Sequence, residues 1–194
     1  MRIIAGEHRG RRLQAPPGRG TRPMLDRVRE ALFSSLAHDI PEARVLDLFA
    51  GTGSLGLEAL SRGAERARFV ERDGRVQRVL AANVQSLGLS ERAQLVRADG
   101  LDAAAWRPEA GSARWDLVFL DPPYPLMRDP STRREVLELV RLLAHEACAP
   151  GAPLVLHVPT GELREEDFEA ELAPRLREYG SSALWIASAP SGGD

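Results

Sequence analysis

Residues 44–56, RVLDLFAGTGSLG, decide the fold of this 194-residue chain. The apolar start of this stretch predicts a buried strand, and Gly51, Gly53 and Gly56 spell G-x-G-x-x-G at the opening of a helix that begins near Ser54. A strand, a glycine-rich turn and a helix in this order are typical of the first unit of an open α/β sheet. The turn in such a sheet binds part of a nucleotide-like ligand.

Further strands and helices are predicted to alternate along the chain. The predicted strands cover residues 44–48, 67–71, 94–98, 116–120 and 153–158, and the predicted helices cover residues 54–62, 74–87, 101–106 and 131–148. Residues 2–13 are predicted to form a two-strand β-hairpin, which residues 15–20 join to a helix at residues 25–37. Residues 172–179 and 183–189 are predicted to end the sheet as an antiparallel pair. This order predicts a doubly wound, mainly parallel α/β sheet.

An acidic residue stands at or just after the end of four predicted strands. These residues are Asp47, Glu71, Asp99 and Asp121. Because ligands of an open α/β sheet bind outside the carboxyl ends of its strands, we expect these acids to line one site. Asp47, at the mouth of the glycine loop, would repel a pyrophosphate and favour a cationic ligand. S-adenosylmethionine meets this requirement, since it carries an ammonium and a sulfonium but no phosphate.

The other predicted cofactor contacts follow from position. Glu71 lies 20 residues after Gly51, where an acid can hydrogen-bond ribose hydroxyls, although nicotinamide cofactors use the same position. Asp99 can accept a hydrogen bond from an adenine amino group. The complete predicted cofactor site consists of Asp47, Phe49, Gly51, Gly53, Glu71 and Asp99.

The motif Asp121-Pro122-Pro123-Tyr124 follows the apolar run at residues 117–120 and indicates methyl transfer to an amino nitrogen. Such a nitrogen shares its lone pair with a π-system, and a carboxylate together with a free carbonyl can localise that lone pair by accepting its two N–H bonds. Prolines lack an N–H group and disfavour helix, so the carbonyl of Pro122 stays available. Tyr124 offers a ring on which an unstacked base can lie. We therefore predict that Asp121, Pro122 and Tyr124 are catalytic.

Taken with these motifs, the chain resembles the RsmD type of bacterial 16S ribosomal RNA (guanine-N2)-methyltransferases, which are class I S-adenosylmethionine-dependent enzymes. The resemblance is carried by residues 3–6, 9–11, 21–33, 45–63, 69–73 and 119–124, and by Asn83. It implies a seven-stranded Rossmann-like sheet, a methyltransferase domain at residues 21–190, and methylation of the exocyclic amine of one guanine. The family usually places Thr after Arg22-Pro23, where this chain has Met24.

The amino-terminal segment is basic, whereas the remainder of the chain is acidic. Residues 1–35 contain eight Arg and three acidic residues, a net charge of +5, and the rest carries −7. Because phosphate backbones bind by charge neutralisation, we predict that residues 1–20 form an RNA-facing arm. The predicted RNA-binding residues are Arg9, Arg11, Arg12 and Arg22. The resemblance implies a partner, 16S rRNA in the small ribosomal subunit or in an assembly intermediate.

The composition argues against several other kinds of protein. With Cys148 as the only cysteine and four scattered histidines, we expect no disulfide and no metal site. Structural or surface roles are expected for the histidines, His8, His38, His145 and His157. No apolar run is long enough to span a membrane, so a single-domain, cytoplasmic protein is expected, and we predict a monomer.

Three alternative functions remain open from the sequence. A nicotinamide-dependent oxidoreductase would account for the glycine loop but not for the Asp-Pro-Pro-Tyr motif. A non-catalytic RNA-binding module would account for the basic arm but not for the four acids at strand ends. A DNA adenine amino-methyltransferase is the nearest alternative, but 194 residues leave little room for a domain that recognises a DNA target.

Overall fold

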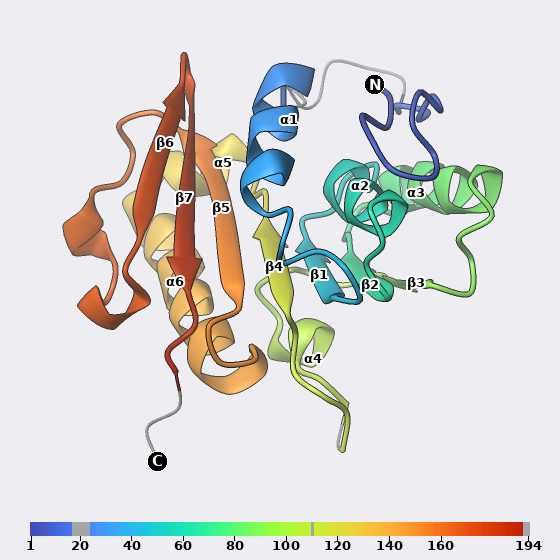
Figure 1. The fold of residues 1–194 in the computed structure, drawn as a ribbon. Coiled ribbons are helices and arrows are strands. Elements are labelled where there is room, and N and C mark those ends of the chain that lie inside the picture. The colour runs from blue at the N-terminus through green and yellow to red at the C-terminus, as the bar shows by residue number, and fades with distance from the viewer. Residues whose placement is uncertain (17–23, 110, 192–194) are drawn as a thin grey trace.

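The computed structural model describes residues 1–16, 24–109 and 111–191, which build one seven-stranded sheet covered by helices on both faces (Figure 1). The strand order is β3-β2-β1-β4-β5-β7-β6. The strands are β1 (Arg44–Leu48), β2 (Arg66–Val70), β3 (Ala93–Val96), β4 (Leu117–Leu120), β5 (Pro153–Pro159), β6 (Arg175–Tyr179) and β7 (Ser182–Ser188). The first five strands pair in parallel, while β7 is antiparallel to both β5 and β6, so the predicted doubly wound, mainly parallel sheet is confirmed.

The helices divide between the two faces of the sheet according to the alternation of side chains along each strand. They are α1 (Asp26–Ser35), α2 (Ser54–Ser61), α3 (Gly74–Ser86), α4 (Ala103–Trp106), α5 (Tyr124–Arg128) and α6 (Pro130–Leu142). Helices α1, α2 and α3 share one buried apolar core with Val45 and Phe119. Helices α4, α5 and α6 share the second core with the neighbouring strand residues Leu46 and Leu120 (Figure 1).

Several predicted boundaries differ from the structure. The helix predicted at residues 131–148 ends as α6 at Leu142 and continues as one π-helical segment, η1 (Leu143–Ala147). The strand predicted at residues 172–179 begins only at Arg175, because two 3₁₀ turns, η2 (Glu165–Asp167) and η3 (Ala170–Leu172), precede it. The short helix α5 was not predicted, since five residues are too few to show a helical period.

The amino-terminal segment folds back on itself over α2. One antiparallel bridge joins Arg2 and Arg12, but residues 1–16 contain no regular strand, unlike the predicted β-hairpin. The segment pairs with itself in part, since the N–H of Ile3 donates to the carbonyl of Arg11 at 3.0 Å. The next amides bond to α2 instead: the backbone N–H groups of Ile4 and Ala5 donate to the carboxylate of Glu58 at 2.7 and 3.0 Å. Glu58 is fully buried, so these bonds fasten the segment to the domain.

Two further observations concern single sequence expectations. Met24, which occupies the usual threonine position, is buried in the core shared with α1, where an apolar side chain suits its surroundings. None of the helices in the described residues is long and apolar enough to span a membrane.

Candidate active site

The four acids at strand ends gather at one edge of the sheet. Asp47 lies in β1, while Glu71, Asp99 and Asp121 follow β2, β3 and β4. These strands are neighbours and run parallel, so their carboxyl ends meet at the same edge. In the sheet, β1 lies between β2 and β4. The chain continues from β1 to β2 and β3 on one side and then crosses to β4 on the other side, so the order of the strands reverses between β1 and β4. Open α/β sheets bind their ligands at such a point.

The glycine loop between β1 and α2 has a left-handed backbone. Gly51 and Gly53 have φ angles of 56° and 82°, in a region that favours glycine. A Cβ on Gly53 would lie 2.4 Å from Cδ1 of Leu80, so the residue has no room for a side chain. Phe49 has a φ of 57° although it is not glycine, and non-glycine residues in this conformation are found with enrichment at ligand sites.

Asp47 is a buried carboxylate at the base of this loop. It is 1% exposed, and its Oδ2 accepts a hydrogen bond from the backbone N–H of Gly56 at 2.9 Å. Burial raises the pKa of Asp47 well above its ordinary value, and the charges of Asp121 and Glu71 raise it further, against the opposing bond from Gly56. No ion pair of Asp47 with Arg or His occurs among the residues that the structure describes. A cation bound here would relieve this unbalanced negative charge.

Glu71 and Asp99 lie where they were predicted, and both hold local backbone. Glu71 accepts from the N–H of Gly51 at 3.0 Å and from the N–H of Asp73 at 2.8 Å, so it fastens the glycine loop to the end of β2. Asp99 accepts from the backbone N–H of Leu101 at 3.1 Å and from the guanidinium of Arg72 at 3.1 Å, the latter in an exposed ion pair. Carboxylates offer about four acceptor positions, so both acids can still accept further hydrogen bonds from a ligand.

The Asp-Pro-Pro-Tyr motif follows β4 at the same edge. The side chain of Asp121 is 36% exposed and thus reaches solvent. The carbonyl of Pro123 accepts from Leu126 at 2.9 Å, but the turn, loop and cap bonds of the described residues include none to the carbonyl of Pro122. Tyr124 begins α5, and its hydroxyl lies 3.4 Å from Oγ of Ser182.

His157 is a functional candidate that the sequence analysis missed. It was expected to have a structural or surface role, but it lies on β5 with its Nδ1 2.8 Å from Oδ1 of Asp121. Its ring also meets Tyr124, with centroids 6.2 Å apart and planes at 65°. The one signal in the sequence was a polar residue inside the apolar run that forms β5, and the partner came only from the pairing of β5 with β4.

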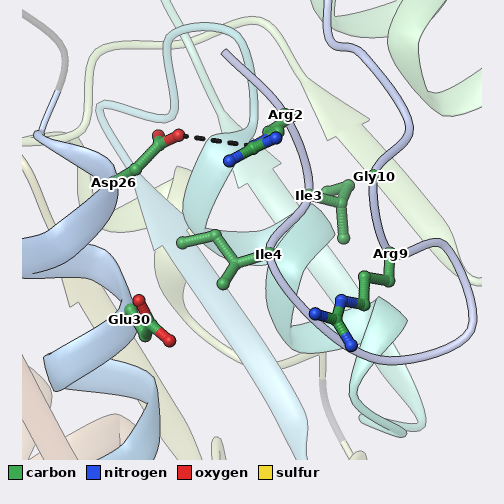
Figure 2. Close-up of a pocket in the computed structure, with 7 residues that line it drawn as sticks. All are labelled: Arg2, Ile3, Ile4, Arg9, Gly10, Asp26 and Glu30. Atoms are coloured by element: carbon green, nitrogen blue, oxygen red, sulfur yellow. Dashed lines mark ion pairs between the residues drawn. The ribbon is translucent and has the colours of Figure 1, made fainter.

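The predicted RNA-binding arginines lie on the amino-terminal segment. Arg9 lines a surface hollow of about 230 Å³ beside α1, together with Arg2, Asp26 and Glu30 (Figure 2). Arg11 donates to the backbone carbonyl of Ser86 at 2.7 Å on α3. Arg12 is exposed, and Arg22 lies outside the described residues. Arg9 therefore lies beside α1 and Arg11 against α3, and these two helices share one core with α2, the helix that follows the glycine loop.

Comparison with known proteins assigns the chain to a family. A model of the family described as conserved hypothetical protein 95 matches residues 1–187. The chain belongs to this family. A solved structure from Escherichia coli, described as putative methyltransferase yhhF, superposes with a TM-score of 0.82 at 32% identity, and the match covers 99% of both chains. This likeness confirms the predicted Rossmann-like methyltransferase fold.

Curated relatives of the family are named for ribosomal RNA. The putative rRNA methyltransferase YlbH of Bacillus subtilis is 45% identical over 127 residues, which cover 64% of this chain and 67% of that protein. Ribosomal RNA small subunit methyltransferase D of E. coli is 44% identical over 124 residues, which cover 64% of this chain and 60% of that protein. The matches thus span about two thirds or less of these relatives. They confirm the predicted RsmD type of the chain.

Proposed function

We propose that this chain transfers a methyl group from S-adenosylmethionine to the exocyclic amine of one guanine in 16S rRNA. The observation that carries the proposal is the meeting of the Asp-Pro-Pro-Tyr motif with the buried acid of the glycine loop. Asp47 on β1 pairs with Phe119 on β4, two residues before Asp121, and the charge of Asp121 adds to the burial that raises the pKa of Asp47. A cationic methyl donor beside Asp47 would therefore lie next to an amino group held by Asp121. The names of the relatives support the broader activity, methylation of ribosomal RNA.

The loop residues suit the cofactor by charge and by shape. When bound, S-adenosylmethionine supplies an electrophilic methyl group. Asp47 would balance its positive charge, Gly51 and Gly53 with Phe49 would hold its methionine part, and Glu71 and Asp99 would accept from its ribose and adenine. The fit rests on the buried carboxylate of Asp47, which has no Arg or His partner among the residues that the structure describes, and on the left-handed backbone of Gly51 and Gly53, which have no side chains to obstruct a ligand. The same negative charge would repel the pyrophosphate of a nicotinamide cofactor, so such a cofactor is disfavoured.

The motif residues orient the target amine. The carboxylate of Asp121 and the carbonyl of Pro122 would each accept one N–H of the amine, so that its lone pair faces the methyl donor. The ring of Tyr124 would stack on the guanine. The amine becomes strongly acidic once it is methylated, and its proton leaves to Asp121 or to water. Alignment and charge stabilisation by Asp121 account for most of the expected rate gain.

The RNA partner would approach over the amino-terminal arm, residues 1–20. Its arginines neutralise phosphates but read no sequence, so the choice of one guanine has to come from the shape of a folded RNA. We therefore propose that the substrate is the small ribosomal subunit or an assembly intermediate. The enzyme would act as a monomer in the cytoplasm, where ribosomal subunits occur.

A methyl-transfer assay tests this proposal. Tritiated S-adenosylmethionine is supplied with undermethylated small subunits, with deproteinised 16S RNA and with DNA, and the labelled nucleoside is identified. We expect fast labelling of the subunits on the exocyclic amine of one guanine. Equal labelling of naked RNA would contradict the need for an assembled substrate, and label on adenine or in DNA would favour the DNA adenine methyltransferase instead. Titration with NADH against S-adenosylmethionine tests the oxidoreductase alternative.

A further inference from the structure

His157 is held against the Asp-Pro-Pro-Tyr motif by the register of the sheet. Leu120 of β4 pairs with Leu156 of β5, so the residues that follow them, Asp121 and His157, lie side by side. His157 is only 2% exposed, and its Nδ1 is 2.8 Å from Oδ1 of Asp121. A side chain on a buried strand has little freedom to move, so the place of this imidazole is fixed by the core.

The chemistry of the pair sets the direction of the hydrogen bond. An ionised carboxylate can only accept hydrogen bonds. Nδ1 of His157 therefore carries the hydrogen and donates the hydrogen bond to Oδ1 of Asp121. The other ring nitrogen, Nε2, is buried and has no hydrogen-bond partner among the residues that the structure describes. Burying an imidazole with one unpaired nitrogen in an apolar strand costs desolvation free energy, which an aliphatic side chain would avoid. Its bond to Asp121 is therefore the feature that distinguishes His157 from an aliphatic residue.

We propose that His157 is a positioning residue, which holds Asp121 in the orientation that receives the target amine. Because Oδ1 already accepts from His157, Oδ2 keeps both of its acceptor positions for substrate, and rotation of the carboxylate is restrained. The edge contact between the imidazole and Tyr124 places the same side chain against the ring proposed to stack on the base. This inference rests on the role proposed above for Asp121, and it adds the residue that prepares that role.

Two substitutions separate the hydrogen bond from the ring. His157→Phe keeps an aromatic ring beside Tyr124 but removes the donor, whereas His157→Asn keeps an N–H donor close to the position of Nδ1 but removes the ring. We expect His157→Phe to lower kcat about tenfold to a hundredfold, with KM for S-adenosylmethionine within about twofold of the unsubstituted enzyme. We expect His157→Asn to recover most of kcat even if its Tm is lower. A purely structural role would lower kcat in parallel with Tm in both variants.

The assay uses undermethylated small subunits and includes two reference variants. His145→Phe replaces a surface histidine that bonds to Glu169, and its kcat should not change. Asp121→Ala tests the proposed function itself and should lower kcat about a hundredfold. If Asp121→Ala is inactive but His157→Phe has normal kcat, the positioning role is refuted and the proposed function stands. If Asp121→Ala also has normal turnover, the proposed role of Asp121 fails and the inference fails with it.

Discussion

The carboxylate of Asp47 accepts a hydrogen bond from the backbone N–H of Gly56 at 2.9 Å, and this buried bond closes the glycine loop across nine residues. Gly56 can lie so close because it has no side chain: a Cβ there would lie 2.4 Å from Cε1 of Phe69. The loop is thus held by a charge that the interior disfavours, since burial raises the pKa of Asp47. A protein rarely keeps such a group without a ligand that compensates it.

The first prediction is that Asp47→Asn stabilises the protein without cofactor and weakens its affinity for S-adenosylmethionine. Asparagine keeps an oxygen that can accept from Gly56 but removes the charge. Because the folded-state pKa of Asp47 is raised, the unfolded state loses this proton first, and the stability of the unsubstituted protein falls as pH rises above about 4. The stabilisation by Asp47→Asn should therefore be absent at low pH and grow towards neutral pH.

Denaturant unfolding at several pH values and calorimetric titration with S-adenosylmethionine measure the two effects. The control is Asp39→Asn, an exposed acid on the turn after α1, which should alter neither quantity. If the stability gained by Asp47→Asn over the unsubstituted protein is no larger at neutral pH than at acid pH, the carboxylate of Asp47 is not under electrostatic strain.

The second prediction concerns Tyr124, whose ring and hydroxyl have different surroundings. Within the part of the chain that the structure describes, the hydroxyl makes one long hydrogen bond, at 3.4 Å to Ser182, so Tyr124→Phe should keep kcat within a few-fold. Tyr124→Ala should lower kcat about tenfold or more, because stacking on a base is worth about 1–3 kcal/mol. Both variants are compared in methyl transfer to small subunits. An equal decrease in both would assign the working interaction to the hydroxyl.

Local patterns were sufficient to predict most of the sheet. The glycine loop, the acids after the strands and the apolar runs are short-range signals, and they placed β1 and the other strands at nearly the right positions along the chain. They also brought Asp47, Glu71 and Asp121 to one edge, because parallel strands present their ends together. What these patterns could not give was α5 and the π-helical end of α6, where tertiary packing outweighs periodicity.

The missed parts of the site depend on interactions between distant residues. His157 meets Asp121 across 36 positions, and Glu58 holds the amide of Ile4 across 54. Glu58 stands within the stretch 45–63 that carries the family resemblance, but nothing in that stretch indicates its partner. Each residue acquires its role from the register or packing that brings the partner close. Glu58 also breaks the usual rule that charges lie outside. Helix α2 is buried from Leu55 to Ser61, so the charge of Glu58 does not mark an exposed face as it would on an ordinary amphipathic helix.

The third prediction tests the amino-terminal arm. Replacing Arg9, Arg11 and Arg12 together with Ser should weaken RNA binding and flatten its salt dependence. The log–log slope should decrease by about 0.7–0.9 for each phosphate that these arginines no longer neutralise. The affinity for S-adenosylmethionine should stay the same. Binding to an RNA fragment at several salt concentrations measures the slope.

A matched triple variant controls for the removal of charge alone. Arg164, Arg175 and Arg177 are exposed. Arg175 and Arg177 lie on β6, which is on the opposite side of the molecule from the amino-terminal segment (Figure 1), and Arg164 directly precedes η2. Their replacement by Ser should leave the slope close to that of the unsubstituted protein. If both triple variants flatten the slope equally, the arm has no special part in RNA binding.

The last prediction concerns Asn83, which links the amino-terminal segment to the glycine loop. Its buried amide accepts from the N–H of Gln14 at 2.7 Å and donates to the carbonyls of Gln14 and Thr52, each at 3.1 Å. Asn83→Leu, of similar size, would leave these backbone groups unpaired, so it should lower the free energy of unfolding by about 1–3 kcal/mol and weaken cofactor binding. Gln85→Leu, exposed on the same helix, should change the stability by about 0.5 kcal/mol or less. A decrease in stability with unchanged cofactor affinity would show that the glycine loop does not depend on this link.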